Sequence, residues 1–572
     1  MKHLGKYIKP YVGFIILTMF IKLVGAVLEL WIPSLMEIML DEKAPAGETG
    51  QIYLYGGLMI LCAIGCVVLN ILANRMSAVS SGKITRKIRH DLFEKLQSLS
   101  ARQMDGLTVS SAESRLTSDT YNVNQMLARI QRMGIRAPSL LIGGLFMMLG
   151  MDTTLALILL ALLPIIGIVV YFVTKISVPM YTQQQTVLDR VVRVVQENIT
   201  GIRVIKALSK TEYEKGRFEQ VNEELTDIGL KAGMVTGATN PVSSLVMRIG
   251  LTLVVLIGAL KVNDGRMEAG VIVAALQYFV MIINAMMGVT RIFVMWSKGE
   301  ASAKRVAEVL RMEEDLQLLP GEEPEENAPH IEFRDVTFSY TGVGTNIENL
   351  SFRLEHGQTL GILGATGSGK STVLNLLMRL YDVDSGAVLL DGQDVRTIPN
   401  DVLRKKFGVV FQNDFLAEGT IGGNIRFFRE LPDEAVERAA CHAQASFIRE
   451  KEGAMDAEVV VRGNNLSGGQ KQRLLIARAL AAEPEILVLD DASSALDYAT
   501  DASLRRALRE NYRHTTTVVV AQRISSLRHA DLILVLDDGQ VIGMGNHQQL
   551  MESCEEYRII AHTQMGEGKE DA

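Results

Sequence analysis

The sequence is poor in cysteine, with four in 572 residues. Cys62 and Cys66 are one helical turn apart inside an apolar run, while Cys441 and Cys554 lie in the more polar second half of the chain. Disulfide frameworks belong to small secreted domains with many paired cysteines. We therefore expect all four residues to be reduced thiols.

A cleavable signal peptide is also missing. The N-terminus MKHLGKYIKP is short and basic, but the apolar stretch after it is too long for a signal-peptide core and has no small-residue cleavage site. We therefore expect this stretch to remain as the first membrane helix.

Apolar residues are abundant by contrast. They make up 48% of the chain, and the mean hydropathy is +0.18, which is high for a soluble protein of this length. Residues 1–310 contain 32 Lys and Arg against 23 Asp and Glu, whereas residues 311–572 contain 26 against 42. The sequence therefore predicts a basic, apolar membrane part followed by an acidic, soluble part.

Six segments are candidates for membrane spans, each of which needs about 20 apolar residues. Five are long enough by themselves, at residues 11–38, 52–75, 155–174, 242–261 and 270–296. The sixth, PSLLIGGLFMMLGM at 138–151, is extended upstream through residues 131–137, and it pairs with the next span across the short turn MDTT. Six spans place both termini on the same side of the membrane.

Lys and Arg residues near the span ends predict the orientation. Residues 76–137 carry ten of them and residues 175–241 carry nine, whereas the loops on the opposite side carry only Lys43, Lys261 and Arg266. Basic loops face the cytoplasm. We therefore expect a multi-pass protein of the cell membrane with both termini in the cytoplasm.

The long basic segments are helical in pattern, because KITRKIRHDLFEKLQSL and VLDRVVRVVQENITGIRVIKAL carry apolar residues three and four apart. Pro, Gly and acidic residues then mark a linker. The alternating segment HIEFRDVTFSY begins a soluble α/β domain. We expect a helical membrane domain with long cytoplasmic extensions at 1–310, a linker at 311–329, an α/β phosphate-loop domain at 330–565 and a tail at 566–572.

A phosphate-binding loop follows the apolar strand TLGIL and precedes the helical pattern TVLNLLMRL. Its glycines let backbone N–H groups face phosphates at a helix N-terminus, where the local potential is positive. Lys370 reaches the outer phosphates and Ser371 is a ligand for Mg²⁺, so the expected cofactors are ATP and Mg²⁺. The loop GATGSGKST consists of Gly364, Ala365, Thr366, Gly367, Ser368, Gly369, Lys370, Ser371 and Thr372.

The segment LSGGQKQRLLIARAL, residues 466–480, resembles the signature of ATP-binding cassette (ABC) ATPases. In that family, the signature lies at a helix N-terminus and contacts the γ-phosphate of an ATP held by another cassette, which again places an anion at a helix end. The resemblance assigns this role to Leu466, Ser467, Gly468, Gly469 and Gln470.

Further cassette elements follow in the family's order. The resemblance places Tyr340 against adenine, Gln412 at Mg²⁺ and the membrane domain, Asp490 at Mg²⁺ and Asp497 in a loop at the dimer interface. The six spans resemble the membrane domain of ABC exporters, whose cytoplasmic extensions end in short helices that dock on the cassettes. Here the candidates are residues 103–111 and 210–218. Such a chain is a half-transporter, so the working unit must be a dimer.

Two positions depart from the family pattern. Asp491 stands where a glutamate usually polarises the attacking water, and Gln522 stands where a histidine usually contacts the γ-phosphate. Asp is one methylene shorter, and a glutamine carries no positive charge and relays no proton at neutral pH. Positioning and electrostatics dominate phosphoryl transfer, so we expect slow hydrolysis at this chain's own site while ATP binding survives.

Because LSGGQ matches the consensus, the sequence resembles the degenerate-site subunit of bacterial heterodimeric multidrug ABC exporters. The expected partner is a second half-transporter with Glu and His at the two positions and an altered signature. A homodimeric exporter or lipid flippase with slow hydrolysis is one alternative. An ATP-gated regulatory or channel-like membrane protein is another, although the sequence has no long regulatory insert.

Charged residues within spans are candidates for the substrate path because they are costly in a membrane. An ion pair between Lys22 and Glu29 is the alternative for those two residues. Acidic residues favour cationic amphiphiles as substrates, with lipids and peptides as alternatives. A protease-coupled peptide exporter is not expected, because the sequence shows no peptidase-like segment. Six spans exclude the soluble DNA-repair and translation branches, so no nucleic acid is expected. The candidate path residues are Lys22, Glu29, Glu37, Asp41, Arg248 and Arg291.

Overall fold

The computed structural model describes residues 4–321, 328–413 and 415–565, apart from some side chains within its long helices. The chain divides into two compact units. The first comprises residues 1–97 and 110–312, and the second comprises residues 98–109 and 313–572. The expected tail at 566–572 lies outside the described residues.

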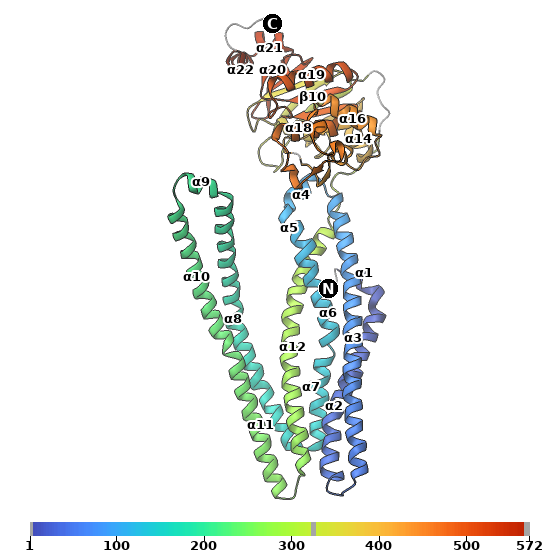
Figure 1. The fold of residues 1–572 in the computed structure, drawn as a ribbon, viewed down its shortest axis with the longest axis vertical. Helices are drawn as coiled ribbons and strands as arrows, with labels where there is room; N and C mark the ends of the chain where they lie inside the picture. The colour runs from blue at the N-terminus through green and yellow to red at the C-terminus, as the bar shows by residue number, and fades with distance from the viewer. Residues whose placement is uncertain (1–3, 322–327, 414, 566–572) are drawn as a thin grey trace. The chain divides into compact units, whose positions relative to one another are not determined.

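The first unit is entirely helical in its described part (Figure 1). Helix α8 packs along α10 and α11, and α12 packs along α6, α7 and α2. The helices are α1 (Gly5–Ile8), α2 (Val12–Ile38), α3 (Thr49–Ser98), α5 (Val109–Ser114), α6 (Thr120–Met133), α7 (Arg136–Met151), α8 (Thr153–Thr200), α9 (Ile202–Ala207), α10 (Thr211–Gly237), α11 (Thr239–Asn263) and α12 (Ala269–Leu310).

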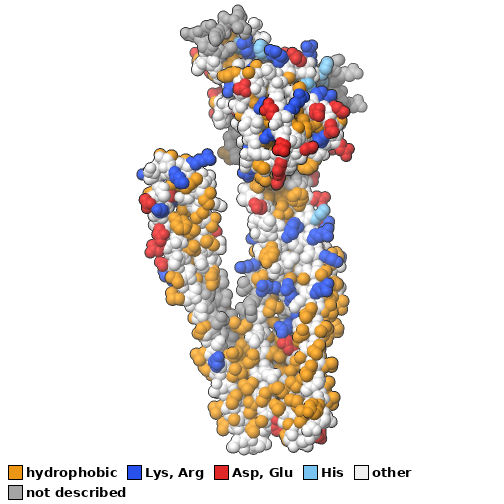
Figure 2. Space-filling model, viewed as in Figure 1, with side chains coloured by type: hydrophobic (Ala, Val, Ile, Leu, Met, Phe, Trp, Pro, Cys, Tyr) orange, Lys and Arg blue, Asp and Glu red, His pale blue; other side chains and the backbone are white. Residues whose placement is uncertain are grey.

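Five helical stretches are long and apolar enough to cross a membrane: Gly5–Lys43, Thr49–Ser98, Val109–Met151, Ser244–Asn263 and Ala269–Val289. The span predicted at 155–174 lies on the 48-residue helix α8, whose described apolar part is Thr153–Ile165. Hydrophobic side chains cover the lower part of this unit in Figure 2, and Lys and Arg gather higher along the same helices. The chain is therefore a multi-pass membrane protein.

The short turn expected between the third and fourth spans is present. Helix α7 ends at Met151, α8 begins at Thr153, and Asp152 lies between them. The Asp152 carboxylate accepts hydrogen bonds from the backbone N–H groups of Thr154 and Leu155, both at 2.9 Å. Lys261 of α11 donates to the same carboxylate at 2.6 Å. This cap fixes the hairpin because it satisfies N–H groups that have no partner within the helix.

The second unit is an α/β domain with two main sheets. The antiparallel sheet has the order β2-β1-β4-β5, and the larger sheet has the order β12-β11-β3-β10-β9-β6, parallel except for β12. The strands are β1 (Ile331–Phe338), β2 (Ile347–Leu354), β3 (Thr359–Gly364), β4 (Ser385–Leu390), β5 (Gln393–Asp394), β6 (Phe407–Val410), β7 (Gly419–Thr420), β8 (Glu458–Val459), β9 (Ile486–Asp490), β10 (Thr516–Val520), β11 (Leu532–Asp537) and β12 (Gln540–Gly545).

Helices cover the parallel sheet. Strand β9 and the interior of β3 are buried on both faces, which explains why they read as continuous apolar runs in the sequence. The helices are α13 (Lys370–Leu377), α14 (Asn400–Lys405), α15 (Ile421–Arg426), α16 (Asp433–His442), α17 (Phe447–Glu450), α18 (Gly468–Leu480), α19 (Tyr498–Asn511), α20 (Ile524–Leu527), α21 (His547–Ser553) and α22 (Glu555–Met565).

A short helix from the membrane half belongs to this second unit. Helix α4 (Ala101–Leu107) is capped by Ser100, which also donates a 2.8 Å hydrogen bond to Asp315. The Tyr381 hydroxyl donates to the Asp105 carboxylate at 2.5 Å, and burial together with that carboxylate raises the pKa of Tyr381. The stretch expected to dock on the cassette, residues 103–111, thus begins on a helix packed against it.

The second stretch expected to dock on a cassette, residues 210–218, is not a separate short helix in the structure. Residues 210–218 form the start of the long helix α10, while the short helix at this turn of the chain is α9, further upstream. Gly201 interrupts the helix between α8 and α9, and Ser209 has a positive φ of 53° after α9. The short helix α9 therefore lies between Gly201, where φ is −88°, and Ser209, where φ is positive.

Candidate functional site

A pocket of about 300 Å³ lies beside the carboxyl ends of strands β3, β9 and β10. Ligands of α/β sheets bind at such strand ends. The pocket gathers residues from the phosphate loop, the end of β9 and the segment after β10, and these are Tyr340, Asn346, Thr366, Gly367, Gly369, Lys370, Ser371, Thr372, Gln412, Asp490, Asp491, Val520, Ala521 and Gln522.

The phosphate loop depends on glycines for its shape. Gly367 and Gly369 have φ values of +90° and +100°, which L side chains rarely adopt. A Cβ on Gly369 would lie 2.6 Å from Ile347 Cδ1, and one on Gly364 would lie 2.3 Å from the Leu536 carbonyl oxygen. Gly369 precedes α13, so the loop delivers free N–H groups and the positive end of a helix to the pocket.

Lys370 folds back over the loop. Its Nζ donates to the carbonyl oxygens of Gly364 at 2.9 Å and Ala365 at 2.6 Å. Burial lowers the pKa of Lys370, whereas the carboxylates of Asp490 and Asp491 act in the opposite direction. The ammonium group is therefore positioned at the loop and is available to an anion in the pocket.

Ser371 and Asp490 form a set of oxygen atoms that fits Mg²⁺. The Ser371 hydroxyl donates a 3.1 Å hydrogen bond to the Asp490 carboxylate. Asp490 is 6% exposed, and burial raises its pKa. Mg²⁺ prefers oxygen ligands and is commonly held by one or two carboxylates together with phosphates. Gln412 lines the same pocket with an exposed side chain that offers a further oxygen.

Tyr340 is held by contacts on both ends of its side chain. Its hydroxyl accepts from Asn375 at 3.0 Å and lies 3.4 Å from Thr372 Oγ1, and its ring meets Tyr381 edge to face at 5.0 Å. Its backbone N–H donates to Asn346 at 3.0 Å. Asn346 also lines the pocket, although no sequence motif identified it.

Asp491 and Gln522 both line this pocket. Asp491 has a positive φ of 51°, and its N–H donates to the Val520 carbonyl at 3.0 Å. Burial raises the pKa of Asp491, and the charges of Arg523 and Lys370 oppose the shift. The structure thus brings the two unusual residues to the same nucleotide pocket.

The segment that carries Gln522 is supported by the C-terminal helix. Gln564 of α22 donates to the Gln522 carbonyl at 2.8 Å and accepts from the Ile524 N–H at 2.8 Å. Sequence analysis did not identify Gln564, because a single polar residue on an amphipathic helix gives no signal of a contact 42 residues away.

The signature residues lie apart from this pocket. Among the residues that line it in the described part of the chain, none belongs to Leu466–Gln470. Ser467 caps α18: its hydroxyl accepts from the Gln470 N–H at 3.3 Å, and the Gln470 side chain accepts from the Ser467 N–H at 3.0 Å. Leu466 is buried, whereas Ser467 and Gly468 are exposed. The helix end therefore faces outward, where a second molecule has access to it.

Asp497 has a structural contact in this chain. It caps α19, accepting from the Thr500 N–H at 3.0 Å and from the Thr500 hydroxyl at 2.8 Å. These hydrogen bonds lower the pKa of Asp497.

The charged residues of the first span have partners other than one another. The predicted alternative of an ion pair between Lys22 and Glu29 is wrong, because Lys22 donates to Asn74 at 3.0 Å while Glu29 accepts from Arg136 at 2.9 and 3.0 Å. Glu29 and Arg136 line a cavity of about 670 Å³ whose other walls are largely apolar, with Gln277 and Asn284 as further polar residues.

The remaining candidates lie elsewhere. The Asp41 carboxylate accepts from the N–H groups of Gly270 and Val271 at 2.5 and 3.0 Å, so it caps α12. Glu37 is half-buried and Arg248 is exposed, and neither lines the cavity that contains Glu29. The side chain of Arg291 lies outside the described residues.

Two family models match the chain. One, described as the ABC transporter transmembrane region, matches residues 15–286, and one described as ABC transporter matches residues 347–494. The first match lies within the helical unit and the second within the phosphate-loop domain described above.

Curated relatives are similar over the whole chain. An uncharacterized ABC transporter ATP-binding protein of Mycobacterium tuberculosis is 32% identical over 98% of this chain and 97% of its own length. An uncharacterized ABC transporter ATP-binding protein of Bacillus subtilis is 33% identical over 99% of each. A fatty acid ABC transporter ATP-binding/permease protein of Mycobacterium tuberculosis is 32% identical over 83% of this chain and 76% of its own length.

The fold is also found among solved structures. The structure of a bacterial Atm1-family ABC exporter with ATP bound superposes with a TM-score of 0.82 and 23% sequence identity. The match covers 97% of this chain and 100% of that one.

The separation of the signature from the pocket predicts different effects of two serine substitutions. Ser371→Ala should weaken Mg²⁺-dependent binding of ATP about tenfold, because it removes a hydroxyl beside Asp490. Ser467→Ala should cost α18 about 1 kcal/mol as a lost cap, yet leave the ATP affinity of this chain unchanged. Titration of each purified variant with a fluorescent ATP analogue measures the two ATP affinities. Equal weakening by the two substitutions would show that Ser467 contacts the same nucleotide as Ser371.

Proposed function

The chain belongs to the ABC transporter family, and on that premise we propose that it is the slowly hydrolysing half of a heterodimeric exporter. Its cassette holds one ATP at a weakly catalytic site, and its signature completes the hydrolytic site of a different half-transporter. The cassette and both termini lie in the cytoplasm. The observation that carries this proposal is the position of Asp491 and Gln522 in the same pocket, away from the signature.

The carboxylate of Asp491 is poorly suited to the hydrolytic step. Hydrolysis needs a water molecule held in line with the γ-phosphate, and misplacement by about 1 Å costs on the order of a hundredfold in rate. Asp is one methylene shorter than Glu, so its carboxylate lies further from that water. Burial raises the pKa of Asp491 against the charges of Arg523 and Lys370, so the short reach of the carboxylate, and not its basicity, limits this step.

Gln522 removes a second contribution. An imidazolium at this position would place a positive charge at the γ-phosphate, whereas a glutamine donates only a neutral hydrogen bond. Its backbone is fixed by Gln564, so the segment keeps its place and the change is confined to the side chain. ATP binding depends on the phosphate loop, which keeps Lys370, Ser371 and its glycines.

The signature supports a second cassette as partner. The exposed N-terminus of α18 offers free N–H groups and positive potential to an anion, and the chain's own pocket does not use them. In a dimer, the signature of each chain covers the ATP that the other chain binds. The N-termini of α13 and α18 then both contact phosphate. The partner then carries Glu and His at the two catalytic positions and an altered signature.

Two other functions remain as alternatives. A homodimeric exporter or lipid flippase would hydrolyse slowly at two identical sites. An ATP-gated regulatory or channel-like protein would pass substrate without one ATP turned over for each transport event. ATP turnover by the chain alone favours the homodimeric exporter or flippase. Substrate flux without ATP hydrolysis favours the ATP-gated regulatory or channel-like protein.

The membrane cavity favours an amphiphilic substrate, either a lipid-like molecule or a hydrophobic cation. Its walls are apolar apart from the Glu29–Arg136 pair and two amide side chains, so it fits an apolar body with one polar group. A curated relative is named a fatty acid transporter, which is in keeping with a long apolar substrate. Peptides with an apolar body and one polar group belong to the same class of amphiphilic substrates.

Restoring the usual residues should restore hydrolysis. Asp491→Glu with Gln522→His should raise ATP turnover of the chain alone by about ten- to a hundredfold, since a positioned base and a charged contact return to the γ-phosphate. Turnover is measured in lipid nanodiscs by phosphate release.

The matched control is Asp537→Glu, which makes the same chemical change at the exposed end of β11. It should leave turnover unchanged. If the double substitution binds ATP normally and gains no turnover, the assignment of Asp491 and Gln522 as the cause of slow hydrolysis is wrong.

Substitution in the cavity should alter substrate preference. Glu29→Gln removes the carboxylate partner of Arg136 and leaves a net positive charge, so transport of hydrophobic cations should fall several-fold while that of amphiphilic anions rises. Uptake into inverted vesicles with a fluorescent cation and a fluorescent fatty acid measures both. Glu42→Gln, at a carboxylate that does not line the cavity, is the control. Unchanged transport of both probes would exclude this cavity from the substrate path.

A further inference from the structure

Two histidines and an aspartate meet at one end of the antiparallel sheet. In the register of this sheet, Ile331 at the start of β1 pairs with Leu354 at the end of β2 and with Leu390 at the end of β4. His330 directly precedes β1, His356 follows β2 by two residues, and Asp391 directly follows β4. The topology therefore brings together three side chains that are up to 61 positions apart in the sequence.

His330 is held in one orientation with one nitrogen unused. Its side chain is 0% exposed, and its Nδ1 lies 2.6 Å from the Thr516 hydroxyl. Its Nε2 is buried and has no hydrogen-bond partner among the described residues. A buried polar atom without a partner destabilises the folded state. The Nε2 faces Asp391, whose Oδ1 is 3.9 Å away, too far for a hydrogen bond.

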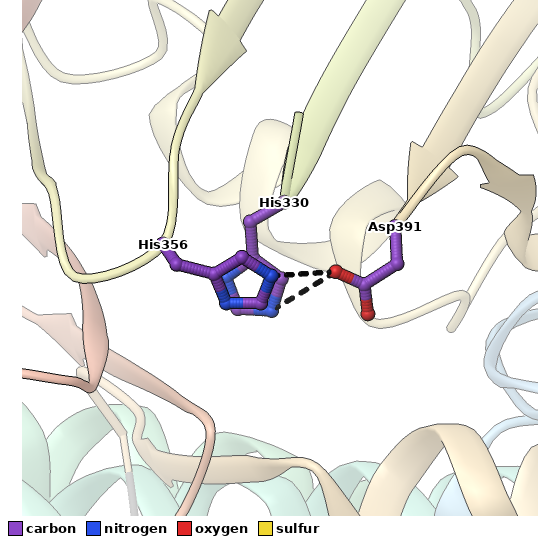
Figure 3. Close-up of side chains that lie close together, drawn as sticks. All are labelled: His330, His356 and Asp391. Atoms are coloured by element: carbon purple, nitrogen blue, oxygen red, sulfur yellow. Dashed lines mark ion pairs between the residues drawn. The ribbon is translucent and has the colours of Figure 1, made fainter. Parts of the chain in front are cut away.

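His356 completes the group (Figure 3). Its Nε2 lies 3.0 Å from the same Asp391 oxygen, and its ring stacks on that of His330 with centroids 3.8 Å apart. The three ligand atoms all lie within 4.8 Å of one another. Two stacked rings direct their lone pairs nearly parallel, so one ring must turn before both reach a single ion. His356 is 63% exposed and has room to do so, whereas His330 stays fixed.

The charges around the group favour a divalent cation. Asp391 lies 3.6 Å from Lys406, but Lys406 is also paired with Glu485. The two carboxylates and one ammonium leave a net charge of −1 beside two imidazoles. Burial lowers the pKa of His330 to about 4, so this ring is neutral near physiological pH.

We propose that His330, His356 and Asp391 form a binding site for a divalent transition metal, with Zn²⁺ the best match. Two imidazole nitrogens and one carboxylate oxygen are a usual zinc ligand set, with bonds of about 2.0–2.2 Å and a fourth position open to water. In the tautomer that carries its proton on Nδ1, His330 donates to the Thr516 hydroxyl and keeps the lone pair of Nε2 for the metal.

The site is separate from the ATP pocket, because none of its three residues lines that pocket. The three ligands flank the ends of strands β1, β2 and β4 of the antiparallel sheet, and only His330 also contacts Thr516 of β10 in the parallel sheet. A bound metal therefore joins three strand ends of the antiparallel sheet. It should stabilise the folded cassette by an amount that grows with the logarithm of the free metal concentration above the dissociation constant.

The test is titration of the full-length chain, purified without a histidine tag, with Co²⁺ and then Zn²⁺. The tetrahedral visible absorption of Co²⁺ should saturate at one ion per chain, and Zn²⁺ should displace it. Zn²⁺ should also raise the cassette's midpoint of thermal unfolding. His356→Ala, at an exposed position, and Asp391→Asn should each weaken metal binding by more than about a hundredfold.

Two control variants isolate the site. His562→Ala changes an exposed histidine on α22 and should leave binding unchanged. His90→Ala removes a ligand from an exposed group on α3, His90, Asp91 and Glu94, and should also leave the absorption unchanged. Binding that is lost in His90→Ala but kept in His356→Ala would overturn the proposal, as would the absence of any tetrahedral absorption in the wild-type chain.

Discussion

Anion binding at a helix N-terminus is the interaction on which the proposed function depends, and the chain contains two helix ends suited to it. One is α13, which receives the phosphate loop and lies in the chain's own pocket. The other is α18, whose capped and exposed end carries the signature and does not line that pocket. Because each end is complete by itself and only one serves this chain's ATP, the chain needs a second cassette to use both.

The phosphate-binding motifs and the hydrolytic positions differ in how well they match the family pattern. The phosphate loop and the signature match the family pattern, whereas Asp491 and Gln522 depart from it. Under the proposed function, a carboxylate that is one methylene short and an amide in place of an imidazole act on the same γ-phosphate, so their effects on the rate combine in one site. ATP at this site must, under that proposal, be held for longer than the partner's site takes to turn over.

Much of the fold was predictable because its signals are local. The phosphate loop between strand and helix, the capped helix of the signature and the turn at Asp152 each follow from short segments. The short helix was expected within residues 210–218, whereas the structure has α9 at Ile202–Ala207, and no local sequence signal marked these bounds. The contacts of Glu29 with Arg136, of Gln564 with Gln522 and of His330 with Asp391 depend on which helices and strands are neighbours, and no single-sequence pattern contains that information.

The most direct measurement is ATP hydrolysis in lipid nanodiscs by this chain alone and by this chain purified together with a half-transporter encoded beside it. The account predicts little turnover alone and robust turnover in the pair. In the pair, turnover should be abolished by replacing the partner's catalytic glutamate and only reduced by replacing Asp491. Robust turnover by the chain alone would contradict the account, because Asp491 and Gln522 would then suffice for catalysis in a homodimer.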